Sequence, residues 1–317
     1  MEIISFSNGI LKLLDQRKLP FATEYLLCRN YQETIAAIKN MAVRGAPAIS
    51  IAGAYAVAQA AEGGYDTGRA GEEIISARPT AVDLANAVNF MLSGISEEKE
   101  PEALAREWEQ TVYENCKSLC RHGAALIKPR STVLTHCNTG PLAAGKYGTA
   151  LGAIIQAHKE GKNPFVLVDE TRPRFQGALT SWELLQEGIP HKVIVDSAAA
   201  SLMGGGEVNL IMVGADRICK NGDFANKIGT YSLAILAKHH GIPFYVLAPS
   251  STLSSVEKGE NIIIEQRDER EVLEPMGKSA YNEKTRALNY AFDVTPGELV
   301  TAFVTEKGVF EKPHKLE

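Results

Sequence analysis

The sequence predicts an α/β protein in which a Rossmann-like, doubly wound parallel sheet follows a smaller, mainly helical domain. From residue 130 onward, short apolar runs alternate with stretches of helix length, which is typical of repeated βαβ units. Before about residue 125, apolar residues recur instead at helical spacing. We therefore expect a mainly helical domain over residues 1–125 and a Rossmann-like domain over residues 126–317.

Five short apolar runs, rich in β-branched residues, predict the buried strands of the sheet. They are Thr132–Cys137, Phe165–Asp169, Lys192–Asp196, Leu210–Gly214 and Phe244–Ala248. The intervening stretches predict helices over roughly 147–160, 177–187, 198–203 and 229–240. Three glycines stand where such helices should end, as is common at C-terminal caps: Gly161, Gly188 and Gly241.

The N-terminal part is expected to contain four helices. Pro47 fits the first turn of the second helix, where a missing N–H is harmless, and Thr80 is expected to cap the third. The predicted helices are Tyr31–Met41, Ala46–Ala61, Ala81–Leu92 and Pro101–His122.

The composition of the chain excludes several kinds of partner. It is 45% hydrophobic and 22% charged, which is typical of a globular protein, and its net charge of -5 leaves no basic footprint. Nucleic acid and anionic membrane are therefore not expected as partners.

The same sequence favours a cytoplasmic location. It has no apolar run of membrane-spanning length, and its start lacks the basic and apolar segments of a secretory signal. Five cysteines without a CxxC pair suit a reducing compartment.

Two ionisable side chains stand just beyond predicted strands. Cys137 lies in Thr135–Gly140, and Asp216 lies in Val213–Ile218. The carboxyl edge of a parallel sheet is where α/β proteins bind ligands, so we expect this thiol and this carboxylate to share proton-transfer work there. The alternative is structural: a buried Cys137, and Asp216 paired with the adjacent Arg217.

Three segments near helix starts are suited to binding an anion. Arg44, Gly45 and Ala46 combine a guanidinium with amides at the start of a helix, where the helix dipole favours phosphate. Arg78 and the Asn226–Lys227 pair could add further positive charge. Each segment alone is typical of a surface or salt-bridged side chain, but the three together favour a phosphate ligand.

A glycine-rich segment resembles a nucleotide-binding loop but lacks a required residue. Gly140–Tyr147 matches GxxxxGK, yet Tyr147 stands where a P-loop needs Ser or Thr to ligate magnesium. Pro141 also removes an amide that could hold phosphate. We interpret this segment as a strand-to-helix turn.

The sequence offers no pattern of metal ligands. Cys116 and Cys120, with His122 nearby, form at most half of a zinc site, and no HxxxH or paired Asp-x-Asp cluster is present. We expect no metal and no cofactor. His136 alternates to the side of its strand opposite Cys137, so it is expected to be packed or hydrogen-bonded.

Five ordered motifs together resemble the methylthioribose-1-phosphate isomerase family. They are Arg44–Ile49, Thr135–Asn138, Asp169–Pro173 with Gln176–Gly177, Val213–Arg217 and Asn226–Tyr231. The resemblance spans about residues 14–268. The same superfamily contains ribose-1,5-bisphosphate isomerase and the non-catalytic regulatory subunits of a eukaryotic translation-initiation exchange factor. The unbroken catalytic motifs argue against the regulatory branch.

The resemblance implies a role for each motif residue. Cys137 and Asp216 would be the catalytic pair. The residues that would hold the phosphate and the sugar hydroxyls are Arg44, Gly45, Ala46, Arg78, Gln176, Asn226 and Lys227. The implied protein is a metal-independent homodimer that converts 5-methylthioribose 1-phosphate to 5-methylthioribulose 1-phosphate in methionine salvage.

Two departures from the family pattern leave the sugar's 5-substituent open. Pro141–Lys146 differs from the family's usual alanine-rich loop, and Gly177–Trp182 is one residue shorter than the family's pattern. The alternatives are an isomerase of 5-deoxyribose 1-phosphate or of ribose 1,5-bisphosphate. The alternative from another class is a phosphosugar- or nucleotide-sensing regulatory subunit that uses Arg44 and Lys227 without turnover.

The implied reaction makes specific demands on the catalytic pair. An aldose with an esterified anomeric oxygen needs acid assistance to open its ring. As a hypothesis, a dry environment keeps Asp216 protonated, because desolvation disfavours a carboxylate, and Asp216 donates to the ring oxygen. Cys137 then abstracts the C2 proton, or stabilises charge if a hydride shifts instead.

Overall fold

The computed structural model describes residues 2–79 and 81–311, and the chain forms two compact units. Unit 1 comprises Met1–Ser118 with Thr139–Gly152, and unit 2 comprises Leu119–Asn138 with Ala153–Glu317. The predicted boundary between residues 125 and 126 lies within the first stretch of unit 2. The predicted cap Thr80 lies outside the described residues.

Unit 1 contains the helices that periodicity predicted. They are α1 (Tyr31–Lys39), α2 (Ala46–Glu62), α4 (Val82–Ser96) and α5 (Pro101–Ala125), which continues into unit 2. A further helix, α3 (Thr67–Ser76), was not predicted. Asp66 explains where α3 begins, because its carboxylate accepts a hydrogen bond from the Arg69 amide.

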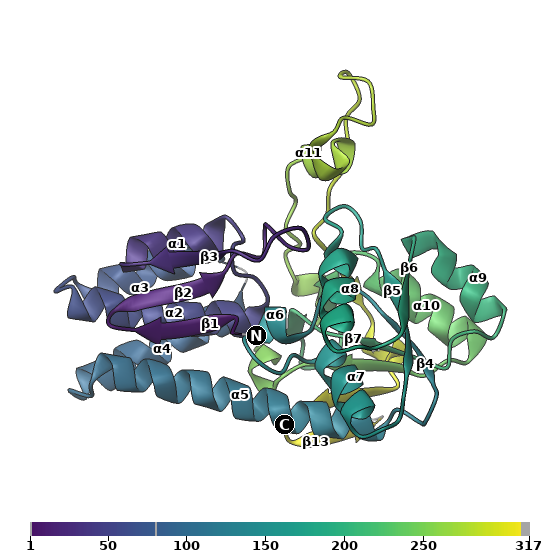
Figure 1. The fold of residues 1–317 in the computed structure, drawn as a ribbon, viewed down its shortest axis with the longest axis horizontal. Coiled ribbons are helices and arrows are strands. Elements are labelled where there is room, and N and C mark those ends of the chain that lie inside the picture. Colours follow the sequence, from purple (N-terminus) through teal and green to yellow (C-terminus); the bar gives the residue numbers. More distant parts are fainter. Residues whose placement is uncertain (1, 80, 312–317) are drawn as a thin grey trace. The chain divides into compact units, whose positions relative to one another are not determined.

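A three-stranded antiparallel sheet in unit 1 was also missed. Strands β1 (Ile4–Ser7), β2 (Ile10–Leu14) and β3 (Tyr25–Cys28) pair in sequence order (Figure 1). Phe6 of β1 stacks on Tyr55 of α2, with ring centroids 4.5 Å apart. Unlike most of the apolar runs of unit 2, these strands mix buried and more exposed residues over only four or five positions, which is too few to reveal a strand by alternation.

Residues 139–152 form part of unit 1 and include the loop that resembles a nucleotide-binding loop. The short helix α6 (Pro141–Ala144) accepts a hydrogen bond at the Leu142 carbonyl from Gln16 Nε2, at 2.7 Å. Tyr147 makes an edge contact with the ring of Tyr113. These contacts agree with the interpretation of the segment as a structural turn.

Unit 2 is built on a seven-stranded sheet with the order β13-β12-β10-β7-β4-β5-β6. All neighbouring strands are parallel except β12 and β13. The strands are β4 (Thr132–Thr135), β5 (Phe165–Asp169), β6 (His191–Ile194), β7 (Leu210–Val213), β10 (Phe244–Leu247), β12 (Ala302–Thr305) and β13 (Gly308–Glu311). The chain moves outward in opposite directions from β4 and β7, so the topological switch point lies between these two strands.

Helices cover both faces of this sheet, which confirms the predicted doubly wound class. The connecting helices are α7 (Ala150–Lys159), α8 (Gln176–Gln186), α9 (Ala199–Gly204) and α10 (Thr230–His240). Residues of α9 and α10 share one apolar core with Leu134, Ile211 and Phe303 of the sheet. Gly123 of α5 contacts the opposite face, where an added Cβ would lie 2.4 Å from Leu247 and 2.7 Å from Ala153.

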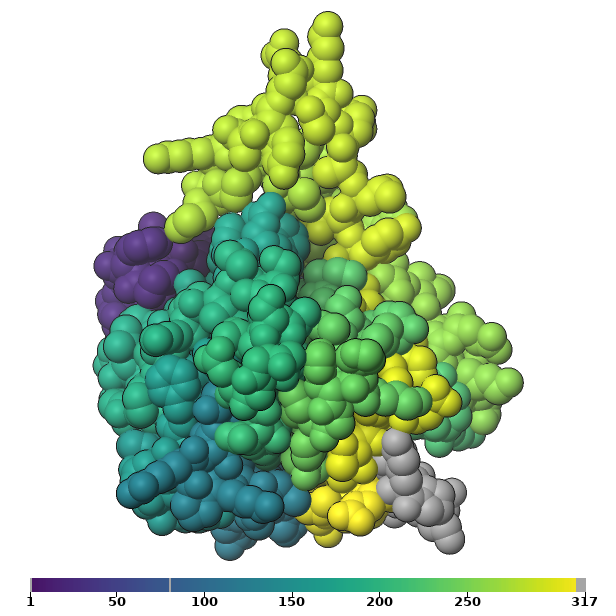
Figure 2. Space-filling view, turned by 90° about the vertical axis from the view of Figure 1, so that its right-hand side faces the viewer, coloured from purple at the N-terminus to yellow at the C-terminus, as the bar shows by residue number. Residues whose placement is uncertain are grey.

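Unit 2 also carries a smaller sheet and a projecting arm. Strands β8 (Arg217–Ile218), β9 (Phe224–Lys227) and β11 (Phe292–Thr295) form an antiparallel sheet of order β11-β9-β8. Between β9 and β11 in sequence, residues 262–291 form the arm, which contains α11 (Arg270–Leu273) and stands out in Figures 1 and 2. Among the described residues, no helix combines the length and apolarity needed to span a membrane.

Candidate active site

The two predicted catalytic residues follow the two strands that flank the switch point of unit 2. Strands β4 and β7 run side by side, with Thr135 opposite Met212. Cys137 follows the end of β4, and Asp216 follows the end of β7. The Asp216 amide donates to the Ala225 carbonyl at 2.9 Å, which ties this turn to β9. The sheet therefore brings the thiol and the carboxylate to one edge.

The backbone of Cys137 is held in a strained conformation. Its φ of 64° is in the left-handed region, which is costly for a residue with a side chain and is found at functional sites. The Cys137 amide donates to Thr171 Oγ1 at 2.9 Å, and its carbonyl accepts from Thr180 Oγ1 at 2.8 Å. Cys137 is partly exposed, whereas the four other cysteines are buried. The burial that the structural alternative expected is therefore wrong for Cys137.

Lys227 is a buried ammonium close to both of these residues. It lies on β9, is 9% exposed and donates from Nζ to the Ala291 carbonyl at 2.8 Å. Its pKa is lowered because burial removes the ammonium from water; the charges of Cys137 and Asp216 oppose that shift. Both groups therefore lie within electrostatic range of Lys227.

Two further predicted residues of unit 2 present polar groups from buried positions. Asn226 is 4% exposed and donates from Nδ2 to Thr230 Oγ1 at 2.9 Å. Gln176 begins α8 and is 7% exposed; its Oε1 makes no hydrogen bond within the described part of the chain. A buried carbonyl oxygen in this state is suited to accept a hydrogen bond from a ligand hydroxyl.

Unit 1 carries the other predicted binding residues, Arg44, Gly45, Ala46 and Arg78. Gly45 precedes α2 with a φ of 90°, and an added Cβ would lie 2.3 Å from the Ala143 carbonyl oxygen. The turn therefore requires glycine. The hydrogen bond from the Ile49 amide to the Gly45 carbonyl, 2.9 Å, is the first of the helical pattern. The amides that precede Ile49 therefore lie at the N-terminus of the helix, where backbone N–H groups lack a partner within the helix. Arg78 is partly buried in the turn between α3 and α4.

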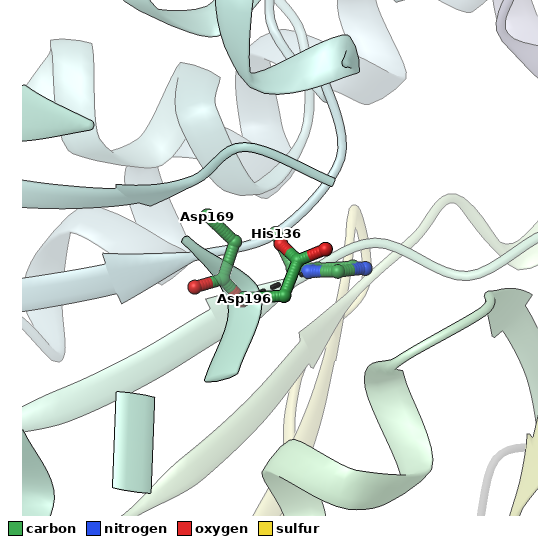
Figure 3. A group of neighbouring side chains, drawn as sticks. All are labelled: His136, Asp169 and Asp196. Carbon is green, nitrogen blue, oxygen red and sulfur yellow. Dashed lines mark hydrogen bonds and ion pairs between the residues drawn. The ribbon is translucent and has the colours of Figure 1, made fainter. Parts of the chain in front are cut away.

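His136 is buried and hydrogen-bonded, as predicted. It also belongs to a group of neighbouring polar side chains that the sequence motifs did not show (Figure 3). His136 is 1% exposed, with Nδ1 2.9 Å from Asp169 Oδ2 and Nε2 2.8 Å from the Ile228 carbonyl. Ligand-type atoms of His136, Asp169 and Asp196 lie within 4.8 Å of one another, a spacing that could hold a metal ion. Both Asp196 oxygens accept backbone amides, from Thr171 and Arg172.

The sequence did not predict this group because its members come from three different strands. His136 follows β4, Asp169 ends β5 and Asp196 follows β6. No fixed sequence spacing links residues that meet only through the strand order. A polar residue at the end of each predicted strand was the available signal. The hydrogen bond between Thr171 and Cys137 was not predicted for the same reason, since the two residues follow different strands, although Thr171 lies within the motif Asp169–Pro173.

Two arginines near Lys227 were also missed. Arg174 and Arg267 both oppose protonation of Lys227. Each pairs with Glu271 on the arm: Arg174 Nη1 lies 2.7 Å from Oε1, and Arg267 Nη2 lies 2.9 Å from the same oxygen. Burial raises the pKa of Glu271, but the hydrogen bonds from Arg267 and Asn289 outweigh burial and leave it below the usual value.

Comparison with known proteins identifies the class of this chain. The sequence model of the Initiation factor 2 subunit family matches residues 42–312 of this chain. The chain is 48% identical to a methylthioribose-1-phosphate isomerase of a Thermoanaerobacter species, over 98% of this chain and 96% of that protein. The chain therefore belongs to the Initiation factor 2 subunit family.

Solved structures divide between two named kinds of protein within that class. The 5-methylthioribose 1-phosphate isomerase of Pyrococcus horikoshii aligns with a TM-score of 0.90 at 38% identity, covering 99% of this chain and 93% of that one. A structure named as subunit delta of translation initiation factor eIF-2B, from A. fulgidus, aligns with a TM-score of 0.87 at 38% identity, covering 99% and 96%. The full-length match to proteins named methylthioribose-1-phosphate isomerase places the chain with that family of isomerases.

Proposed function

We propose that this protein is an aldose–ketose isomerase that converts 5-methylthioribose 1-phosphate to 5-methylthioribulose 1-phosphate, a step of methionine salvage. One observation carries the proposal: Cys137 and Asp216 follow the two strands that flank the switch point of the sheet, and the charges of both favour protonation of buried Lys227. A thiol, a carboxylic acid and an ammonium are the groups that a proton-transfer reaction on an anionic sugar requires.

The chemistry follows from the position of the phosphate on C1. Asp216 donates its proton to the ring oxygen as the bond between that oxygen and C1 breaks. Cys137, as a thiolate facing the Lys227 ammonium, takes the C2 proton and returns it to C1, while the proton of the 2-hydroxyl goes back to Asp216. Both groups end as they began, and the aldose has become a ketose.

The remaining residues are proposed to bind rather than react. Arg44, the amides of Gly45 and Ala46, and Arg78 bind the phosphate through charge and helix-start N–H groups. Gln176, Asn226 and Lys227 bind sugar oxygens; Gln176 offers a buried carbonyl oxygen for a hydroxyl.

Product analysis on three substrates tests the reaction and the 5-substituent together. Purified protein is incubated separately with 5-methylthioribose 1-phosphate, 5-deoxyribose 1-phosphate and ribose 1,5-bisphosphate, and products are identified by NMR. We expect the ketose of the first to form with the highest kcat/KM. A preference of tenfold or more for another substrate would reassign the specificity, and no ketose from any of them would overturn the isomerase.

Solvent deuterium separates the two transfer routes. Proton abstraction by Cys137 exposes the hydrogen to exchange, so deuterium from D₂O should enter C1 of the product. A hydride shift carries the C2 hydrogen directly to C1, so a product without deuterium at C1 would contradict the proton route.

The regulatory alternative is favoured by one observation, the match to a structure named as a translation-initiation subunit. A regulatory subunit would use Arg44 and Lys227 to bind a phosphosugar or nucleotide and return it unchanged. Calorimetry followed by NMR of the same sample distinguishes the two, because an isomerase releases a ketose.

We also propose that the protein acts in the cytoplasm as a homodimer, without nucleic acid, metal or cofactor. Five free cysteines suit a reducing compartment. Pairing is favoured by large apolar side chains exposed on the arm, including Ile263 at 87% and Leu288 at 78%. Sedimentation equilibrium tests the dimer; a monomer at micromolar concentration would contradict it.

A further inference from the structure

The imidazole of His136 connects two segments of unit 2 that carry proposed site residues. His136 directly precedes Cys137 in the chain. Its Nε2 lies 2.8 Å from the carbonyl of Ile228, which directly follows Lys227. One buried side chain therefore joins the backbone next to the thiol to the backbone next to the ammonium.

The direction of this bond follows from its partner. A carbonyl oxygen only accepts, so Nε2 must carry a hydrogen. The imidazole also packs closely on the next residue, because a Cβ added to Gly229, at a φ of 105°, would lie 2.9 Å from His136 Cε1. Asp293 holds the same turn from another side by accepting the amides of Gly229 and Tyr231.

Asp169 fixes His136 and Cys137 by two separate routes. Its Oδ2 lies 2.9 Å from His136 Nδ1, which orients the ring. Its backbone carbonyl accepts from Thr171 Oγ1 at 3.1 Å, and that hydroxyl oxygen accepts from the Cys137 amide. The left-handed backbone of Cys137 and the orientation of His136 thus depend on the same residue.

We propose that His136, oriented by Asp169, is a positioning element that sets the spacing between Cys137 and Lys227 through its Nε2–H···O=C bond to Ile228. His136 touches neither substrate nor reacting atoms in this role. The proposal rests on the proposed function for its kinetic consequences, whereas the reactivity of the Cys137 thiol provides a test that needs no turnover.

Two amide variants of different length separate positioning from general packing. In His136→Gln the side-chain amide reaches the place of Nε2 and can still donate to Ile228, whereas in His136→Asn it reaches only the place of Nδ1. We expect His136→Gln to keep kcat within about fivefold and His136→Asn to lose about thirtyfold or more, with KM changed less than threefold in both. Melting temperatures measured on the same samples should fall by similar amounts.

Alkylation of Cys137 by iodoacetamide at fixed neutral pH gives the independent measurement. A nearby ammonium favours the thiolate, which is the reactive form. His136→Asn should therefore slow alkylation, and Lys227→Met should slow it as well. If His136 acts by placing Lys227 near the thiol, the double variant should be no slower than Lys227→Met alone. Cys137→Ser supplies the background.

The possible outcomes are distinct. Equal kinetic losses in His136→Gln and His136→Asn, or an additive effect of His136→Asn and Lys227→Met on alkylation, would overturn the positioning role. Stoichiometric metal in the purified wild type that is lost in Asp169→Asn would also overturn it, because Nδ1 and Oδ2 would then be ligands. If the wild type isomerises none of the three sugar phosphates but the alkylation pattern holds, the proposed function fails and the positioning role stands.

Discussion

Unit 1 and unit 2 build their candidate binding groups in opposite ways. In unit 1, Arg44, Gly45 and Ala46 are consecutive, and the turn before α2 presents them together. In unit 2, Cys137 and Asp216 follow neighbouring strands of the large sheet, and Lys227, which both influence electrostatically, lies on β9 of the small sheet. The comparison teaches that consecutive residues of one turn can form the proposed anion site, whereas the proposed proton-transfer site needs residues from strands far apart in the chain.

The largest effects are expected at the catalytic pair of unit 2. Cys137→Ser and Asp216→Asn should each lower kcat by about a thousandfold or more, since each removes a group that moves a proton. Steady-state kinetics measures the loss, and circular dichroism checks that the fold is intact. Cys219→Ser makes the same chemical change at a buried cysteine and should stay within about threefold. A catalytic variant with a near-normal rate would remove that residue from the chemistry.

Lys227→Met sharpens the comparison because function and stability should change in opposite directions. We expect kcat/KM to fall by about a hundredfold, since the substrate no longer interacts with the buried ammonium of Lys227. The free energy of unfolding should be unchanged or higher by about 1 kcal/mol, because an apolar side chain has no charge to desolvate. Urea denaturation and kinetics on the same samples test both. A large loss of stability would show that the ammonium holds the fold.

The stability effect of Lys227 should also depend on pH. Burial lowers the pKa of Lys227 from its usual 10.5, so the folded state disfavours protonation. The resulting cost is complete below the folded pKa and disappears as pH rises from that value toward 10.5. The stability difference between wild type and Lys227→Met should therefore shrink with rising pH. A difference that grows between neutral pH and 10 would contradict burial as the dominant cause.

A smaller and different effect is expected in unit 1. Arg44→Ala should raise KM by about thirtyfold with kcat within threefold, because the phosphate is bound in both the ground state and the transition state. The KM of Arg44→Lys should lie between those of the wild type and Arg44→Ala, since lysine keeps the charge but lacks the bidentate fork of the guanidinium. Arg69→Ala, which removes an exposed pair with Glu73, is the control and should change neither constant. An unchanged KM in Arg44→Ala would argue against the phosphate site.

The smallest effect is expected from removing metal ions. The protein should keep full activity after dialysis against EDTA, because protons on Cys137 and Asp216 carry the proposed reaction. The group of His136, Asp169 and Asp196 is where a metal would act if this is wrong. Activity lost on chelation and restored by a divalent ion would identify that group as a metal site.

The strands and helices of unit 2 were predictable because their signals are strong. Short, continuous apolar runs rich in β-branched residues and separated by stretches of helix length predicted β4, β5, β6, β7 and β10 within a few residues. The sheet β1-β2-β3 was not predictable, since its strands mix buried and more exposed residues and their hydrophobic face is defined by packing on α2. The small sheet β11-β9-β8 was missed for a related reason: its strands contain charged and polar residues and form no continuous apolar run.

The candidate site divides along the same line. Cys137 and Asp216 could be named in advance because each follows an apolar strand, and the carboxyl edge of a parallel sheet is a known place for ligands. The pair of Arg174 with Glu271 and the dyad of His136 and Asp169 could not, since the partners are far apart in the chain.

By itself, the sequence determined the main helices of unit 1, the strands β4, β5, β6, β7 and β10, the positions of Cys137 and Asp216 after two of these strands, and the glycine that precedes α2, because these depend on local periodicity and turn chemistry. The tertiary structure alone decided that β4 and β7 are neighbours, that Lys227 is buried within electrostatic range of Cys137, and that His136 joins their two segments. Such contacts depend on strand order and side-chain packing across long separations in the chain, and no local pattern encodes them.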